Sequence, residues 1–229
     1  MSRGLGDVYK RQAYNFGGVL ADEMGLGKTL QIITFLLARK GQKSLVITPT
    51  ALLYNWKKEI EKFAPVLKVA IVHGIKERNQ LINKYKEYDV LLTTYTTFKN
   101  DASFYAGKVF DYCVIDEAQT IKNPDATLTK VIKSIKANVK FALTGTPIEN
   151  NLLELWSIFD FVMPDYLYTR AKFQKIFMSG EDQYGELKQM IQPFMLRRSK
   201  KEVAKELPDK IEQVYYCLLY TSPSPRDTR

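Results

Sequence analysis

A phosphate-binding loop is predicted at residues 22–29, which run Asp22, Glu23, Met24, Gly25, Leu26, Gly27, Lys28, Thr29. In such a loop, glycines let main-chain N–H groups surround an anionic phosphate, lysine adds a positive charge, and a threonine hydroxyl ligates Mg²⁺. The general pattern G-x-x-x-x-G-K-[ST] would have glycine where this chain has Asp22. A glycine-rich turn without a ligand is the alternative, but the apolar run before the loop and the helix-like run after it favour a phosphate site.

Two adjacent acids, Asp116 and Glu117, directly follow an apolar run that is typical of a buried strand. In a phosphate-transferring site, one carboxylate holds Mg²⁺, here through water, and another orients the attacking water. Adjacent acids are common and usually carry no chemistry, but these occur in a chain that also has a phosphate-binding loop. We therefore predict that Asp116 and Glu117, together with Lys28, are catalytic.

Apolar runs alternate with amphipathic stretches along the chain, which is the pattern of βαβ units. The fold class predicted is α/β, a mostly parallel sheet with helices on both faces. Ligands of such sheets bind at the carboxyl ends of the strands, where the loop and the two acids are expected. The expected strands are 18–21, 44–48, 68–72, 90–93, 112–115 and 140–144, and the expected helices are 30–37, 51–63, 76–85, 125–135 and 152–161.

Composition is that of an ordinary globular chain, with 229 residues of which 45% are hydrophobic, enough for one sizeable core or two small ones. No apolar run approaches the length of a membrane span, so no membrane partner is expected. The net charge of +9 suits a polyanionic partner, although lysine-rich surfaces are often only solvated faces. Cys113 and Cys217 lack metal-site spacing and are expected to be reduced thiols of a cytosolic protein.

The two ends differ from the rest of the chain. Residues 1–12 and 217–229 show no helical or strand period and resemble translated sequencing-adapter sequence. We predict that both are non-native tails and set them aside.

The order of the motifs resembles that of the Swi/Snf-type DNA-dependent ATPases, a helicase-like branch of superfamily two. The resemblance includes the acid at position 22, so the departure from the general loop pattern becomes an identifying feature. It covers about residues 15–214. The segments that carry it are 17–31 (motif I), 46–50 followed by Trp56 (motif Ia), 116–119 followed by 121–123 (motif II), 143–150 (motif III), and 195–203 with Leu207 and Pro208.

The resemblance implies a P-loop NTPase lobe of RecA-like fold at 13–165, then a helical extension at 166–216 that leads toward a second lobe. It implies ATP and Mg²⁺ as cofactors. Lys28 would contact the β- and γ-phosphates, Thr29 and Asp116 would hold Mg²⁺, and Glu117 would activate water.

The resemblance also implies double-stranded DNA and a second RecA-like lobe of the parent chain as partners. Gln119, Thr144 and Thr146 would relay the nucleotide state to the DNA-binding surface. From the residues alone, the hydroxyls at 144 and 146 suit capping of the helix that follows. The residues expected to touch a DNA backbone are Pro49, Thr50, Thr94 and Tyr95.

Two parts that the family requires are not found in this sequence: a segment that recognises the nucleotide base, before Asn15, and the second lobe with its arginine fingers. We therefore expect a fragment that binds nucleotide weakly and hydrolyses it negligibly. A nucleotide-dependent interaction module without hydrolysis and an RNA or single-strand helicase lobe are the alternatives. The DEAQ sequence at 116–119 suggests a bacterial parent, located in the cytoplasm or nucleoid.

Other chemistry-bearing residues have structural explanations. His73 follows an apolar run and is expected to be a strand-end residue. Trp56 and Trp156 occur at helical spacing and are assigned to packing. The basic cluster at 197–201 suits either phosphate contact or a solvated helix start, and this choice stays open.

Overall fold

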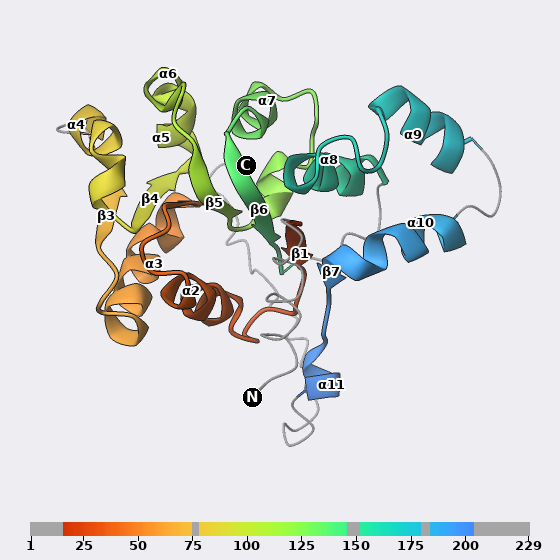
Figure 1. The fold of residues 1–229 in the computed structure, drawn as a ribbon. Helices are drawn as coiled ribbons and strands as arrows, with labels where there is room; N and C mark the ends of the chain where they lie inside the picture. Colours follow the sequence, from red (N-terminus) through yellow and green to blue (C-terminus); the bar gives the residue numbers. More distant parts are fainter. Residues whose placement is uncertain (1–15, 75–77, 146–151, 180–183, 204–229) are drawn as a thin grey trace, which may run out of the picture.

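A seven-stranded sheet with the order β3-β4-β2-β5-β6-β1-β7 forms the centre of the computed structural model (Figure 1). The structure describes residues 16–74, 78–145, 152–179 and 184–203. All of the strand pairs are parallel, as predicted. The strands are β1 (Gly18–Leu20), β2 (Ser44–Thr48), β3 (Val69–Val72), β4 (Val90–Thr94), β5 (Phe110–Ile115), β6 (Ala137–Leu143) and β7 (Met195–Leu196).

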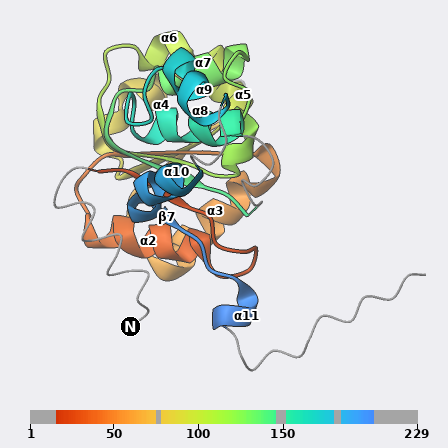
Figure 2. The same cartoon turned by 90° about the vertical axis from the view of Figure 1, so that its right-hand side faces the viewer.

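Helices cover both faces of this sheet, which confirms the predicted architecture (Figures 1 and 2). The longer ones are α2 (Lys28–Ala38), α3 (Thr50–Phe63), α7 (Thr127–Lys133), α8 (Leu152–Val162), α9 (Arg170–Phe177) and α10 (Tyr184–Ile191). Shorter helical segments are α4 (Arg78–Asn83), η1 (Tyr85–Glu87), α5 (Tyr95–Asn100), α6 (Ala102–Tyr105), η2 (Ala118–Ile121), η3 (Gln192–Phe194) and α11 (Lys200–Val203).

The apolar core consists of two clusters, one on each face of the sheet. In β2, Leu45 and Ile47 belong to one cluster and Val46 to the other, because successive side chains of a strand point to opposite faces. Helices α2 and α3 close one cluster, and α4 to α10 close the other. Burial on both faces explains why the strands are nearly continuous apolar runs in the sequence.

The chain beyond α8 returns to the sheet instead of forming a separate body. Phe173 and Phe177 of α9 and Leu187 of α10 are buried in the same cluster as α8. Strand β7, which was not predicted, then pairs with β1. The core therefore continues across residue 165. The division of the chain into a lobe and an extension at this residue stays a prediction. The two tails and residues 204–216 lie outside the described residues.

None of the helices in the described part of the chain is long and apolar enough to cross a membrane.

Candidate nucleotide site

The predicted phosphate loop connects β1 to α2 at the carboxyl edge of the sheet. Gly25 and Gly27 have φ values of 91° and 74°, in the left-handed region that glycine adopts without steric cost. Asp22 is not among the described residues with positive φ, so its position does not require the glycine of the general pattern. Lys28 begins α2, which places its ammonium group beside the helix N-terminus, where an anion is favoured.

The Lys28 side chain folds back over its own loop. Its Nζ atom donates hydrogen bonds to the main-chain oxygens of Asp22, at 2.7 Å, and Glu23, at 3.4 Å. The segment after β6 approaches the same group, because a Cβ atom added to Gly145 would lie 3.4 Å from Lys28 Nζ. The loop after β1 and the loop after β6 therefore meet at this lysine.

Asp116 lies just beyond β5 and is 6% exposed. Its Oδ2 atom accepts a hydrogen bond from Trp56 Nε1 at 2.8 Å, and its Oδ1 atom accepts one from the Glu117 main-chain N–H at 2.9 Å. Burial raises the pKa of the Asp116 carboxyl, while these two hydrogen bonds and the charge of Lys28 oppose that rise. Both oxygens of the Asp116 carboxylate are therefore held in place at the end of β5.

Glu117 links Asp116 to the predicted coupling residues. It has a φ value of 52°, a left-handed conformation that is uncommon outside glycine and occurs often at functional sites. Gln119 Nε2 donates to Glu117 Oε2 at 2.6 Å, and Thr144 Oγ1 donates to Gln119 Oε1 at 3.0 Å. Hydrogen bonds thus connect Glu117, Gln119 and Thr144 in one chain. That this chain relays the nucleotide state stays a prediction. Thr146 lies outside the described residues.

The residues present fit a magnesium ion. The structure's described residues contain no group of three or more His, Cys, Asp or Glu side chains that could hold a metal. Mg²⁺ commonly binds through one or two carboxylates together with substrate phosphates and water, so it does not need such a group. Asp116 keeps acceptor capacity beyond its two hydrogen bonds, and Thr29 supplies a hydroxyl in the first turn of α2.

The predicted DNA-contacting residues divide into two groups. Pro49 precedes α3 and is partly exposed, and Thr50, its first residue, is exposed. Thr94 and Tyr95 are only 1% and 5% exposed. Thr94 Oγ1 accepts the Thr97 main-chain N–H at 3.1 Å and caps α5, and the Tyr95 hydroxyl donates to the Asp116 main-chain oxygen at 2.7 Å.

The DNA-backbone contacts expected of Thr94 and Tyr95 stay a prediction. Both side chains are used inside the protein, so only main-chain groups of this segment remain for such a contact.

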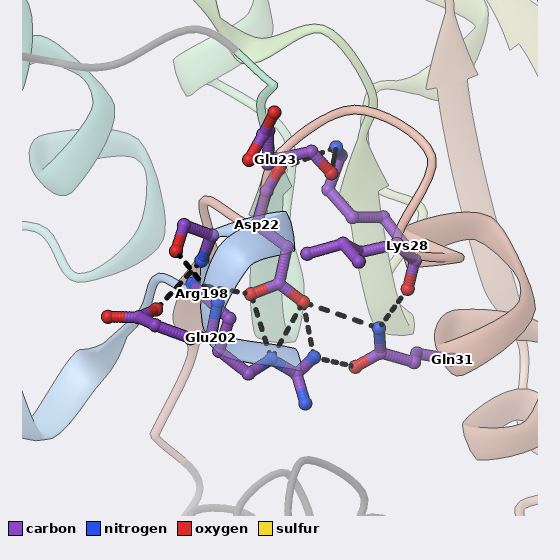
Figure 3. Close-up of polar contacts among 8 residues, drawn as sticks. Asp22, Glu23, Lys28, Gln31, Arg198 and Glu202 are labelled. Carbon is purple, nitrogen blue, oxygen red and sulfur yellow. Dashed lines mark hydrogen bonds and ion pairs between the residues drawn. The ribbon is translucent and has the colours of Figure 1, made fainter. Parts of the chain in front are cut away.

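Two site residues were missed by the sequence analysis. Trp56 was assigned to packing, which its burial confirms, but its bond to Asp116 also places it at the site. Arg198 belonged to a basic cluster with two open interpretations. In the structure its guanidinium group pairs with the carboxylate of Asp22, which is fully buried (Figure 3). No local pattern signals either contact, because the partners are 60 and 176 residues apart.

Comparison with known proteins agrees with this geometry. The family model for the SNF2-related domain matches residues 2–223. The chain belongs to the SNF2-related domain family. The matched range extends into both tails, residues 1–12 and 217–229. The non-native origin of these tails stays a prediction. The Swi/Snf-type resemblance stated from the motifs is confirmed.

Individual relatives and solved structures give the same family. The chain is 47% identical over 204 residues to an uncharacterized ATP-dependent helicase, MG018, of Mycoplasma genitalium. It is 38% identical over 240 residues to the TATA-binding protein-associated factor MOT1 of Saccharomyces cerevisiae. The Sulfolobus solfataricus SWI2/SNF2 ATPase core in complex with double-stranded DNA superposes with a TM-score of 0.82 at 40% identity, which confirms the fold.

This chain spans a minor part of each of these proteins. The matches cover 86% of it but 20% of the Mycoplasma helicase, and 90% of it but 13% of the yeast factor. The structural match covers 92% of it and 46% of the Sulfolobus chain.

Proposed function

We propose that this SNF2-related domain is the ATP-binding lobe of an ATP-dependent translocase on double-stranded DNA. The observation that carries the proposal is the meeting of three strand ends at one edge: Lys28 after β1, Asp116 and Glu117 after β5, and Thr144 after β6. This arrangement provides a positive charge for phosphate, a carboxylate for a metal and a second carboxylate for water.

In the proposed reaction, Lys28 leaves the main-chain oxygens of Asp22 and Glu23 and binds the β- and γ-phosphates of ATP. Thr29 and Asp116 would hold Mg²⁺, which when bound would supply positive charge to offset the charge that develops on the transferred phosphoryl group. Glu117 orients the attacking water and accepts its proton. Gln119 holds the Glu117 carboxylate by a hydrogen bond, so the position of the water depends on the chain that ends at Thr144.

The proposed nucleic-acid partner is duplex DNA. Support comes from the solved SWI2/SNF2 core, which resembles this chain at 40% identity and is a complex with double-stranded DNA. Pro49 and Thr50, at the exposed start of α3, are proposed backbone contacts. A second RecA-like lobe of the parent is the proposed source of the remaining catalytic groups, and the bacterial cytoplasm or nucleoid is the proposed location.

The test is ATP hydrolysis by the full-length parent protein with duplex DNA, single-stranded DNA or RNA. We expect duplex DNA to stimulate hydrolysis most. Glu117→Gln should keep nucleotide binding and lose about 10²- to 10⁴-fold in turnover, because it removes a general base. Lys28→Ala should weaken nucleotide binding itself.

The matched control is Glu61→Gln, which changes an exposed carboxylate on α3 and should leave turnover unchanged. Stimulation by RNA alone would contradict the duplex-DNA proposal. Full activity of Glu117→Gln would contradict the catalytic assignment.

A further inference from the structure

The first part of the phosphate loop is bordered by a segment from the far end of the described chain. Strand β7 aligns Met195 with Val19 and Leu196 with Leu20. Beyond the paired strands, the Ala21 main-chain N–H donates to the Leu196 oxygen at 2.7 Å. The Glu23 N–H donates to the Arg198 oxygen at 3.0 Å. Residues 195–200, which we call the return segment, therefore extend the sheet alongside the loop.

The return segment also contacts the loop through side chains. The Lys200 main-chain N–H donates to Glu23 Oε2 at 2.7 Å. A Cβ atom added to Gly25 would lie 3.5 Å from Lys200 Cε, so the lysine side chain lies over the middle of the loop. The loop is thus held at its beginning and covered near its centre by the same six residues.

An ion pair between Arg198 and Asp22 joins the return segment to the loop (Figure 3). The Arg198 Nε atom lies 3.0 and 3.1 Å from the two carboxylate oxygens of Asp22, and the Arg198 main-chain N–H donates to Oδ1 at 3.0 Å. Arg198 Nη2 also donates to Asp22 Oδ2 and, at 2.9 Å, to Gln31 Oε1. Gln31 Nε2 donates to Asp22 Oδ2 at 3.4 Å and to the Leu26 oxygen at 3.2 Å. The pair therefore connects the return segment, the loop and α2.

The charge of Asp22 bears directly on phosphate binding. Its carboxylate is fully buried, and its main-chain oxygen accepts the hydrogen bond from Lys28. A buried carboxylate without a cation is strongly unfavourable, and here it would repel an anionic phosphate and attract Lys28. Arg198 neutralises that carboxylate and leaves the charge of Lys28 for the phosphate.

We propose that Arg198 is a positioning residue for the nucleotide, and that docking of the return segment and nucleotide binding are coupled through its ion pair with Asp22. The proposal rests on the proposed function, because it requires that the loop binds nucleotide. Coupling between two binding events is reciprocal, so bound nucleotide also holds the return segment more firmly. Displacement of the return segment from the loop would then lower nucleotide affinity.

The first experiment measures binding of a fluorescent ATP analogue with Mg²⁺ to the 229-residue chain. Arg198→Gln should weaken binding by about tenfold, within the usual range for coupled sites. The double variant Asp22→Asn, Arg198→Gln has no buried charge at position 22 and should return to within about twofold of the original affinity, close to the precision of such mutant cycles. Arg198→Lys should bind with intermediate affinity, because lysine keeps the charge but not the two-pronged geometry.

Lys201→Gln is the control, because it removes an exposed cation of α11 three residues further along the chain. Its affinity should be unchanged. Thermal unfolding of each variant separates a loss of binding from a loss of folding. The proposal is overturned if Arg198→Gln binds nucleotide normally, or if the double variant binds no better than Arg198→Gln while both remain folded.

The second experiment measures docking without relying on nucleotide, by hydrogen exchange at the Ala21 and Glu23 amides. Arg198→Gln should increase both exchange rates, and saturating nucleotide should lower them in the unmodified chain. If the unmodified chain binds no nucleotide, the proposed function fails, and so does the coupling. In that case the exchange rates alone test whether Arg198 holds the return segment against the loop. Unchanged rates in Arg198→Gln would overturn this role.

Discussion

Asp116, at the end of strand β5, is held in place by an indole group that comes from helix α3. Trp56 lies on α3 with 1% of its surface exposed, and its N–H points at the carboxylate that is proposed to hold the metal. Buried polar atoms are nearly always hydrogen-bonded, so this contact is part of what allows a carboxylate at this depth. It also joins the proposed metal-binding side chain to the helix that begins at Thr50, a proposed DNA contact.

We expect a strong energetic coupling between Trp56 and Asp116 in a double-mutant cycle with Trp56→Phe and Asp116→Ala. The free energy of unfolding, measured by urea denaturation, should give a coupling of about 1.5–3 kcal/mol, as for hydrogen bonds to charged groups. The matched control cycle uses Trp156→Phe. The indole N–H of Trp156 donates to the Tyr168 main-chain oxygen and not to Asp116. Its coupling to Asp116→Ala should be near zero, and equal couplings in the two cycles would contradict a specific bond.

Strand β1 connects the phosphate loop with the rest of the sheet, since it lies between β6 and β7. The chain enters this strand at Gly17, where the neighbouring element leaves no room for a side chain. A Cβ atom there would lie 2.1 Å from the Lys140 main-chain oxygen and 2.8 Å from Val162 Cγ1. Close packing between β1, β6 and α8 therefore depends on the absence of a side chain at this position.

Gly17→Ala should lower the free energy of unfolding by about 3 kcal/mol or more, at the upper end of the cost of overpacking, because main-chain atoms must move. Urea denaturation of the variant measures this. Gly185→Ala on α10 is the control, because its Cβ atom would meet no atom within 4 Å. It should be neutral or stabilise the chain by up to about 1 kcal/mol. Equal stabilities of the two variants would contradict the close approach at Gly17.

Among the described residues, one buried thiol lies at the centre of the molecule. Cys113 is on β5, the middle strand of the sheet order, and is fully buried. Burial raises its pKa to about 12, and the positive charge of Lys140 opposes that rise. Between pH 9 and 12 the unfolded chain loses the thiol proton while the folded chain keeps it. The unfolded state then binds fewer protons, so the free energy of unfolding falls as pH rises.

The contribution of Cys113 is expected to reach about 1.4 kcal/mol per pH unit above pH 9. Urea denaturation at pH 8 and at pH 10.5 should show a smaller loss of stability in Cys113→Ala than in the parent chain. Cys217 lies outside the described residues and is replaced by serine in both chains. Buried tyrosines titrate in both chains, so an identical pH dependence of the two chains would contradict the raised thiol pKa.

Much of this molecule follows from local patterns in its sequence. The strands from β1 to β6 are nearly continuous apolar runs because both faces of the sheet are covered, and α2 and α3 follow from helical spacing. The loop was identified from its glycines, Lys28 and Thr29, the acids from their place after a strand, and Thr144 from the family resemblance. All of them follow parallel strands, which bring their carboxyl ends to one edge. Neighbouring residues control main-chain conformation, so this information is local.

The contacts between distant segments could not be obtained in this way. Strand β7 has only two residues, and it exists because it pairs with β1. The pairs Arg198 with Asp22 and Trp56 with Asp116, and the burial of Thr94 and Tyr95, depend on which strands are neighbours in the sheet. That order is set by the total packing of the core, and no short stretch of sequence encodes it. The phosphate loop is therefore recognisable in its own eight residues, whereas the arginine that neutralises its first side chain is found only in the folded chain.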